Sequence, residues 1–459
     1  MTPLVPLVMF GWLPFVIWLF SVLKARHAVI AGFLLGWMFL PQHTFVIPGV
    51  PNYSKIMAMS LGILLGTLLF NSQVLSRFRL HILDLPVLIW GFVPFFTALS
   101  NNLGVYDGLS ATLDQLTTWG LPYFIGRLYF HDRQALKELA FGIFLGGLIY
   151  IPFCLWEVVM SPRLHRIIYG FHPHDFGQTK RMGGWRPVVF MEHGLMTAMW
   201  MITAFLSGYQ LFRSGWLHRK FPDWKWFWLP ALIVLLITII LNKSTGAMGL
   251  LALGLLVLHV LYWTRWSLPL LVILLVPVIY VVARGTGTWD GRHLIDAAGR
   301  VASPERTGSL AYRLDNETIL VDKATERFFL GWGGWGRSFV RDDEGRPVSV
   351  PDGLWILAFG QHGVIGLASL LTVLIMPPLL FLRMYPVVSW RGPPVAPLAS
   401  LPILMGIFTV DSLLNAMFNP LILILAGGII GLWINRHQQK AEVYDNRMQL
   451  AARPVTRLF

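Results

Sequence analysis

Residues 267–283 read Ser-Leu-Pro-Leu-Leu-Val-Ile-Leu-Leu-Val-Pro-Val-Ile-Tyr-Val-Val-Ala, and no charged residue lies between Arg265 and Arg284. A helix needs about 20 mainly apolar residues to cross a bilayer, so this run predicts a membrane-spanning helix. Similar windows lie near residues 3–23, 28–47, 56–75, 82–99, 139–160, 187–212, 227–241, 246–263, 353–381, 396–417 and 418–435, with a weaker one near 116–130. We therefore expect an all-α, polytopic transmembrane helical bundle with about 12 to 13 spans.

The composition of the whole chain agrees with this fold class. Of its 459 residues, 55% are hydrophobic and only 13% are charged, against about 25% charged residues in a soluble domain. The single cysteine, Cys154, excludes a disulfide framework and a thiolate zinc site. Lys24 and Arg26 follow the first apolar run and no basic residue precedes it, so we expect a retained span rather than a signal peptide.

Basic connectors fall on one side of the predicted bundle when residues 116–130 are counted as a span. They carry Lys24, Arg26, Arg77, Arg79, Arg133, Lys137, Arg213, Arg219, Lys220, Lys225, Arg265, Arg383, Arg391 and the tail from Arg436 to Arg457. The positive-inside rule makes that side the cytoplasm. The formal net charge of +13 then belongs to the cytoplasmic side, which indicates contact with anionic lipids and gives no support for nucleic-acid binding.

The windows divide the chain into four segments. Residues 1–283 hold the first ten helices and a basic outer loop at 161–186. Residues 284–352 form a large outer loop, 353–435 hold the C-terminal helices, and 436–459 form a basic cytoplasmic tail.

The outer loop at 161–186 concentrates positive charge on a face that is otherwise neutral. It carries Arg163, Arg166, Lys180, Arg181 and Arg186 against one acid, Asp175. This opposes the positive-inside trend and indicates an anionic partner on the outer side. Contact with lipid headgroups is the alternative.

The large outer loop contains an amphipathic helix from about Ser309 to Phe329. Its apolar stripe consists of Leu310, Leu314, Val321, Ala324 and Phe328. Glu317 lies inside this stripe, four residues after Arg313. We expect a local ion pair between these two side chains, with a catalytic role for Glu317 as the alternative.

Polar groups within the apolar windows are further candidates. Glu192 and His193 lie in the run 187–212, one to two helical turns into the predicted span, where an ionisable group needs a wet cavity or a partner. Asp411, Asn415 and Asn419 repeat every four residues and predict one helix face used for packing.

Asn242-Lys-Ser-Thr-Gly246 predicts a tight outer hairpin between two spans. Lys243 there either meets a phosphate or belongs to a simple polar turn. Gly331-Trp-Gly-Gly-Trp-Gly336 matches a dinucleotide-binding pattern, but it lacks the strand before it and the helix after it, so we exclude a nucleotide site. No carboxylate spacing supports a metal site around His172 and His174, and we predict neither a metal nor another cofactor.

Three motifs occur in a fixed order in the second half of the chain. Arg313-Leu-Asp-Asn-Glu-Thr-Ile-Leu-Val-Asp-Lys-Ala324 precedes Phe329-Leu-Gly-Trp-Gly-Gly-Trp-Gly336, and Asp352-Gly353 is followed after nine residues by Gly363-Val-Ile-Gly366. Together with Lys243-Ser-Thr-Gly-Ala247 and Arg186-Pro-Val-Val-Phe190, this order resembles the bacterial O-antigen ligase and polysaccharide polymerase superfamily. The resemblance covers roughly residues 180–370.

Three positions depart from the ligase pattern. Asp352 stands where the ligases have a histidine, Gly353 where they have an asparagine, and Thr245 where they have an arginine. These departures favour a relative that joins glycans to one another over a ligase that transfers them to lipid A core.

The resemblance implies a metal-independent glycosyltransferase at the outer, periplasmic face of the bacterial inner membrane. Its donor would be an undecaprenyl-diphosphate-linked oligosaccharide, and other polysaccharide-assembly proteins would be partners besides membrane lipids. We expect Arg181, Arg186 and Arg313 to bind the diphosphate beside Asp352 in one outward-opening cavity, because guanidinium groups stabilise the charge on a leaving diphosphate.

The remaining roles follow from the same chemistry. Asp352 is the first candidate for the base that deprotonates the acceptor hydroxyl, and Glu192 is the second. His193 and Lys243 are further candidates for substrate binding.

Two other functions fit a polytopic chain. A transporter or flippase of lipid-linked glycan would use Glu192, Asp411 and the basic outer loop, but such proteins are often built from repeated halves, and the large outer loop occurs once. A non-catalytic scaffold of an envelope-synthesis complex would not need Arg186, Arg313 or Asp352.

Overall fold

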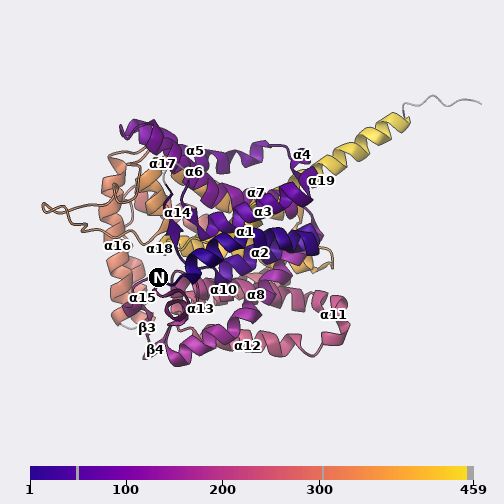
Figure 1. Ribbon diagram of the computed structural model, residues 1–459, viewed down its shortest axis with the longest axis horizontal. Helices are drawn as coiled ribbons and strands as arrows, with labels where there is room; N and C mark the ends of the chain where they lie inside the picture. The colour runs from indigo at the N-terminus through magenta and orange to yellow at the C-terminus, as the bar shows by residue number, and fades with distance from the viewer. Residues whose placement is uncertain (48–50, 302–303, 452–459) are drawn as a thin grey trace, which may run out of the picture.

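The computed structural model describes residues 1–47, 51–301 and 304–451, and nearly all of its regular structure is helical (Figure 1). Strands β1 (Thr44–Phe45) and β2 (Tyr53–Ser54) form one short antiparallel hairpin, and β3 (Lys180–Arg181) and β4 (Gly184–Trp185) form another. The chain is therefore all-α. Residues 302–303 of the predicted outer loop and 452–459 of the predicted tail lie outside the described residues.

Within the described part of the chain, twelve helices are apolar. They are α1 (Leu4–Val22), α2 (Ala25–Phe39), α3 (Lys55–Phe70), α5 (Leu85–Ser100), α8 (Arg133–Met160), α10 (Gly194–Arg213), α12 (Trp228–Leu241), α13 (Thr245–Thr264), α14 (Leu268–Gly285), α17 (Leu354–Met384), α18 (Ser400–Leu414) and α19 (Pro420–Ala451). Within the described ranges, nine of these elements are long and apolar enough to cross a membrane, and α2, α3 and α12 are shorter. The chain thus has the character of a multi-pass membrane protein, and the number of spans stays a prediction.

The other helices connect or cover these twelve. They are α4 (Ser72–Arg77), α6 (Val105–Gln115), α7 (Leu121–Tyr129), α9 (Leu164–Tyr169), α11 (Trp216–Lys220), α15 (Arg292–Val301) and α16 (Pro304–Thr325). Short 3₁₀ turns are η1 (Ile82–Asp84), η3 (Phe176–Thr179), η4 (Pro222–Trp224), η5 (Val387–Arg391) and η6 (Ala396–Leu398), and η2 (Leu116–Gly120) is a π-helical turn.

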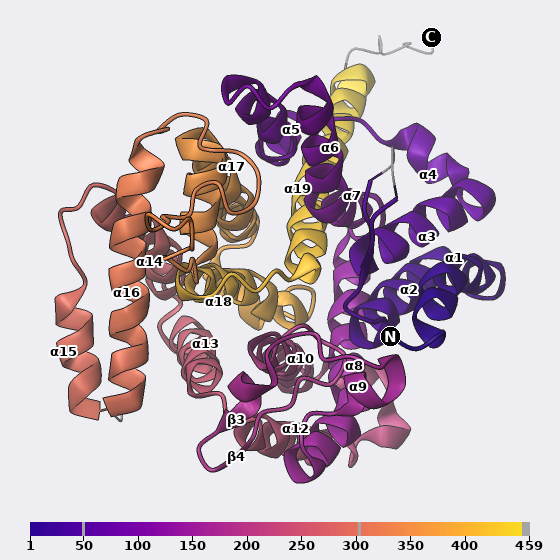
Figure 2. The same ribbon diagram turned by 60° about the vertical axis from the view of Figure 1, so that its left-hand side comes forward.

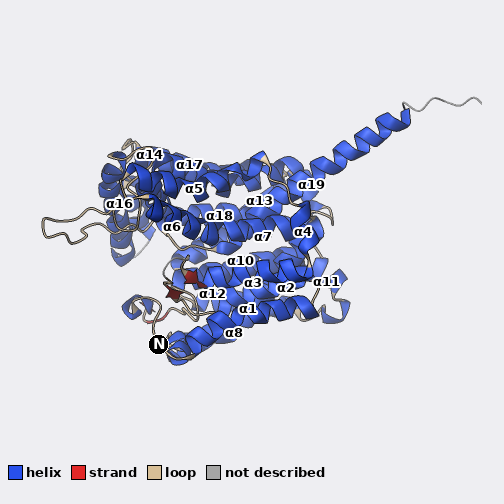
Figure 3. Cartoon of the chain, turned by 45° about the horizontal axis from the view of Figure 1, so that its top comes forward, coloured by secondary structure: helices blue, strands red, loops and turns tan. Residues whose placement is uncertain are grey.

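The apolar helices run roughly parallel and give the bundle two different ends (Figures 1 and 3). We call one the loop end; it carries α15, α16, the β3–β4 hairpin and the N-terminus. The opposite, basic end carries α4, α11 and the far part of α19, and therefore Arg77, Arg219 and Arg436. The predicted basic connectors in these elements thus lie at one end of the molecule.

Residues 105–129, which form α6, η2 and α7, include the weak span predicted at 116–130. Arg127 in α7 donates from Nε to Asp84 Oδ1 over 2.8 Å, next to the start of α5. Gly108 in α6 packs against Phe95 near the other end of α5. The stretch α6–η2–α7 therefore returns antiparallel to α5, and it begins well before residue 116.

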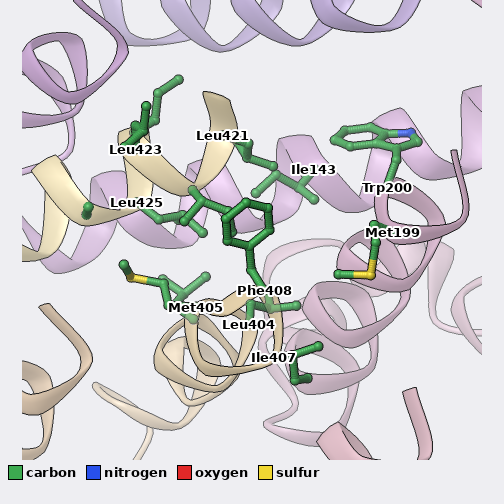
Figure 4. Packing of buried hydrophobic residues seen from close by; sticks show 14 of the residues in the cluster. Ile143, Met199, Trp200, Leu404, Met405, Ile407, Phe408, Leu421, Leu423 and Leu425 are labelled. Carbon is green, nitrogen blue, oxygen red and sulfur yellow. The ribbon is translucent and has the colours of Figure 1, made fainter. Parts of the chain in front are cut away.

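The core lies between α10, α18 and α19. Burial within the chain covers 83%, 89% and 78% of the most apolar windows of these helices, more than in the other six long apolar helices of the described part. Figure 4 shows Trp200 of α10, Phe408 of α18 and Leu425 of α19 turned toward the same interior, with Ile143 of α8 beside them. All three central helices begin or end at the loop end, so their termini shape that surface.

The amphipathic helix α16 lies across the loop end as an outer layer beside α14 and α17 (Figure 2). Leu314, Val321 and Ala324 of its predicted stripe are buried. The helix starts at Pro304 and ends at Thr325, earlier than predicted, and Phe328 beyond it is 46% exposed. This placement aims Arg313 toward the ends of α17 and α18.

The glycine-rich motif holds the outer loop against a bend in α17. Gly331 and Gly363 both have positive φ, at 68° and 63°, and a Cβ on either would lie within 2.6 Å of the other segment's backbone. Trp332 N donates to Gly360 O over 2.9 Å, and Asn101 Nδ2 donates to Gly331 O over 2.9 Å. The motif therefore serves close backbone packing, which only residues without a side chain permit.

Candidate functional site

Arg313 joins three segments of the chain at the loop end. Its Nε lies 3.6 Å from Asp352 Oδ2, just before α17 begins. Its Nη1 donates to Leu414 O over 3.1 Å and to Asn415 Oδ1 over 3.3 Å, at the end of α18. Both charged side chains remain about one-third exposed, at 28% and 33%. Burial raises the pKa of Asp352, and the charge of Arg313 partly opposes that shift.

A separate buried cluster fixes α16 and so fixes Arg313. Glu317 forms an ion pair with Arg284 of α14, with 3.2 Å between Oε2 and Nε. Tyr280 donates to Glu317 Oε2 over 2.6 Å, and Trp355 Nε1 donates to Oε1 over 3.1 Å. The expected pair between Glu317 and Arg313 is therefore wrong: although one turn separates them, Glu317 faces α14 and α17, while Arg313 faces Asp352.

The basic outer loop brings two more arginines to the same region. Arg181 lies on β3, and Arg186 follows β4, where its side-chain stem packs over Gly194 at the start of α10. The charges of Arg186, Arg181 and Arg313 all act on His193. Guanidinium groups from two segments far apart in the sequence thus lie near enough to His193 for their charges to act on it.

His193 is held in its neutral form. Burial, followed by the nearby His174 and the three arginines, lowers the pKa of His193 to about 3. Its Nδ1 accepts from Leu195 N over 3.1 Å, so Nε2 carries the hydrogen and donates to Gln178 Oε1 over 3.2 Å. A neutral imidazole makes both contacts, one as acceptor and one as donor. It also adds no positive charge beside the three arginines.

Residues 187–193 are not helical, which corrects the predicted depth of Glu192 and His193. Helix α10 begins only at Gly194, with His193 as its N-cap. Glu157 of α8 accepts hydrogen bonds from Val188 N and Val189 N with Oε2, over 2.8 and 2.7 Å. Its other oxygen accepts from Leu164 N over 2.9 Å, so one buried carboxylate holds two loops.

Three more buried side chains support this segment. Tyr150 OH accepts from Phe190 N over 3.0 Å, and Lys55 Nζ donates to Phe190 O over 3.1 Å. Thr197 Oγ1 donates to Val188 O over 2.9 Å. Irregular backbone among membrane helices needs such partners, and here side chains from α3, α8 and α10 supply them.

Glu192 lines a polar cavity of about 410 Å³. Lys55, Asp114 and Trp37 line the same cavity. Lys55 is 3% exposed, and its charge interacts with that of Glu192. The cavity therefore offers two carboxylates, a lysine and an aromatic ring, which suits a polar ligand with both hydroxyl groups and an apolar face.

The cavity and the arginines adjoin through two short segments. Glu192 faces the cavity, while its neighbour His193 faces the arginines. In the same way Phe418 lines the cavity, and Asn415 contacts Arg313. Residues 192–193 and 415–418 thus connect a cationic surface to a polar pocket.

Residues 415–419 are not helical either, so the prediction of one helix face for Asp411, Asn415 and Asn419 is wrong. Helix α18 ends at Leu414, and α19 starts at Pro420, where Asn419 Oδ1 accepts from Leu421 N over 3.1 Å. Asn415 turns back and donates to Asp411 Oδ1 over 2.7 Å. Because α18 ends at Leu414, Arg313 reaches the Leu414 carbonyl and the Asn415 side chain there.

Lys243 lies beside the β3–β4 hairpin. Its Nζ donates to Met182 O over 3.4 Å and packs against Gly184. The structure therefore ties Lys243 to the turn that carries Arg181, and not to His193.

The described residues contain no group of three or more His, Cys, Asp or Glu side chains placed to hold a metal ion. Metal independence stays a prediction. No family model and no curated protein matches this chain.

Proposed function

We propose that this protein is an inner-membrane glycosyltransferase of cell-surface polysaccharide biosynthesis. It would transfer glycan from an undecaprenyl-diphosphate-linked donor to an acceptor hydroxyl at the periplasmic face. The observation that supports this most is that the charges of Arg181, Arg186 and Arg313 all act on the buried His193, next to a polar cavity lined by Glu192. A diphosphate at a membrane surface needs such a set of fixed donors, and a sugar needs such a pocket.

In this reaction the acceptor oxygen forms a bond to the anomeric carbon while the bond from that carbon to the diphosphate breaks. The electron pair of the broken bond leaves with undecaprenyl diphosphate, whose charge the guanidinium groups stabilise. The proton of the acceptor hydroxyl passes to a carboxylate, Asp352 or Glu192. Attack opposite to the leaving group inverts the anomeric configuration.

The two carboxylates differ in what surrounds them. Asp352 is paired with Arg313, so an incoming diphosphate competes for that guanidinium and frees the carboxylate as it binds. Glu192 instead faces the polar cavity. Asp352 remains the first candidate, because its release would then be coupled to donor binding.

The acceptor is a growing glycan in this proposal. Asp352 and Gly353 replace the histidine and asparagine of the ligase pattern, which favours polymerisation. Transfer to lipid A core is the alternative acceptor, and it would use the same diphosphate site.

The direct test is turnover by purified protein in detergent or nanodiscs. Undecaprenyl-diphosphate oligosaccharide from the source cells should yield longer glycans and free undecaprenyl diphosphate without added divalent ions. Inhibition by EDTA that added metal reverses would contradict the metal-free mechanism. Absence of any product with donor and acceptor present would contradict the transferase itself.

The orientation has its own test, because the single native cysteine, Cys154, is buried. Tyr312→Cys at the loop end should react with a membrane-impermeant maleimide added to spheroplasts. Lys220→Cys at the basic end should react only after the membrane is opened. The reverse pattern would place the arginine cluster in the cytosol and exclude a periplasmic reaction.

A further inference from the structure

The basic end of the bundle contains a second charged cavity, far from the arginine cluster. It has a volume of about 860 Å³ and lies between the start of α8, α11 and the middle of α19. Four of its lining side chains are cationic: Arg133, Lys137, Arg219 and Arg436. The proposed transferase reaction makes no use of this cavity.

Among the side chains that the structure describes, the acidic groups near these cations are already engaged elsewhere. Asp132 is the one carboxylate of this described part that lines the cavity; its Oδ2 lies 2.7 Å from Arg26 Nη2, and its Oδ1 accepts from Ala135 N over 2.8 Å. Glu138, six residues further along the chain in α8, also pairs with Arg26 over 3.3 Å. The cavity therefore keeps an excess of positive charge.

The cations are gathered rather than spread apart. Lys137 lies close enough to Arg133 and Arg219 to interact unfavourably with both charges. Arg436 stacks 4.9 Å from the ring centre of Tyr385 and donates to Met384 O, which holds its guanidinium at the cavity wall. Like charges held in one place favour an anionic ligand that relieves their repulsion.

The remaining wall is apolar and aromatic. Trp216, Tyr385 and Leu432 line it and are buried. A smaller cavity with Arg77 and Arg79 adjoins the first, since His131 and Asn435 line both. A ligand that fits this surface carries phosphate charge at one side and apolar groups at the other, and tryptophan and tyrosine are typical of the membrane boundary.

We propose that this cavity binds the phosphate headgroup of an anionic phospholipid, with the basic residues of α8, α11 and α19 around the phosphate and Trp216 and Tyr385 beside the glycerol. Basic pockets between membrane helices on one side of a bilayer hold such lipids. The lipid ties the start of α8 to α11 and α19.

The test compares two triple variants of the full-length protein with the same change in charge. Arg133, Lys137 and Arg219 are replaced by glutamine in the first; Lys220, Lys225 and Arg265, which are exposed and outside the cavity, are replaced in the second. Lipids retained from nanodiscs of phosphatidylglycerol and phosphatidylcholine are counted by native mass spectrometry. The first variant should bind phosphatidylglycerol at least about tenfold more weakly than the wild type, and the second nearly as well as the wild type.

Two outcomes would overturn the proposal. An equal loss in both variants would mean that charge attracts the lipid over the whole surface. Inorganic pyrophosphate that displaces the lipid and binds alone with the same dependence on these residues would mean that the site takes a soluble phosphate. Thermal unfolding of each variant is the control that both variants remain folded. Lipid binding is counted directly, so the result does not depend on whether the protein transfers glycan.

Discussion

Arg313 and Asp352 form an ion pair at the loop end, with 3.6 Å between Nε and Oδ2. The same guanidinium holds the C-terminal carbonyl of α18 at Leu414. Helix α16, the segment before α17 and the end of α18 therefore meet at one side chain. The pair leaves both groups partly exposed, so a stronger anion can replace the carboxylate.

Arg313→Lys should lower glycan transfer by about tenfold to a hundredfold. Lysine keeps the charge but loses the planar fork that reaches Asp352, Leu414 and Asn415 together, and a hydrogen bond to a charged group contributes about 1.5–3 kcal/mol. The measurement is the initial rate with purified donor. Arg292→Lys, an exposed arginine of the same outer loop, is the control and should be unchanged. Full activity in Arg313→Lys would remove Arg313 from the diphosphate site.

Asp352→Asn should abolish transfer if Asp352 is the base, while Glu192→Gln should retain it. The wild-type rate should rise with pH as Asp352 ionises, at a pH above the ordinary value of 3.8 because burial raises its pKa. The pH–rate profile of both variants decides between them. Normal turnover in Asp352→Asn together with loss in Glu192→Gln would assign the base to Glu192.

Acid should destabilise the protein through His193. Its pKa is lowered from 6.5 to about 3 by burial first, so between these values the unfolded chain binds a proton that the folded chain does not. The stabilisation from the neutral His193 is complete above about pH 6.5 and is lost as the pH falls toward 3. The unfolding free energy then changes by at most about 1.4 kcal/mol per pH unit. His193→Gln should flatten this part of the curve of unfolding free energy against pH. An unchanged slope would contradict a neutral, buried His193.

Glu157→Ala should destabilise the protein by about 3 kcal/mol or more, because three backbone N–H groups at Leu164, Val188 and Val189 lose their acceptor. Chemical unfolding in detergent measures this. Glu138→Ala on the same helix removes partly exposed side-chain contacts to Arg26, His27 and Gln134 and should cost under about 1 kcal/mol. Equal effects of the two changes would show that residues 187–193 do not depend on Glu157.

Gly363→Ala should release the outer loop from α17. The new Cβ would lie 2.3 Å from the carbonyl group of Phe329, at a backbone φ of 63°. Limited proteolysis of the loop near residue 345 should become much faster. Gly345→Ala has the same kind of φ but open space around it, so its cost is strain alone, about 1 kcal/mol. Similar proteolysis in both would mean that the backbone contact contributes little.

Hydropathy predicts the apolar helices well, because burial in lipid or in the core demands the same composition along each helix. Hydropathy fails where a helix is interrupted. Residues 187–193 and 415–419 continue apolar runs, yet they are not helical. Proline disfavours helix at the residue before it and is preferred at a helix start, so Asn419-Pro420 carried the signal for the second break. Pro187 gave no such signal for the first break, because a proline there would favour a helix that starts at 187, whereas α10 begins at Gly194.

The sequence predicted the arginines of the candidate site, but not the buried side chains that hold its backbone in place. The excess of arginine in one predicted outer loop against the positive-inside trend indicated Arg181 and Arg186, whose charges act on His193 together with that of Arg313. Glu157 and Lys55 gave a weaker signal, as single ionisable groups at the margins of apolar windows. The partner of Glu317 was out of reach, because Arg284 lies on another helix and no local spacing relates the two.

The close approach of Gly331 to Gly363 has a consequence for engineering this protein. Because the turn at Gly331 rests directly on the backbone of α17 at Gly363, neither segment can be exchanged without the other. A chimera that receives residues 284–352 from a relative with another specificity should fold only when it also receives the helix bend on which that insert sits.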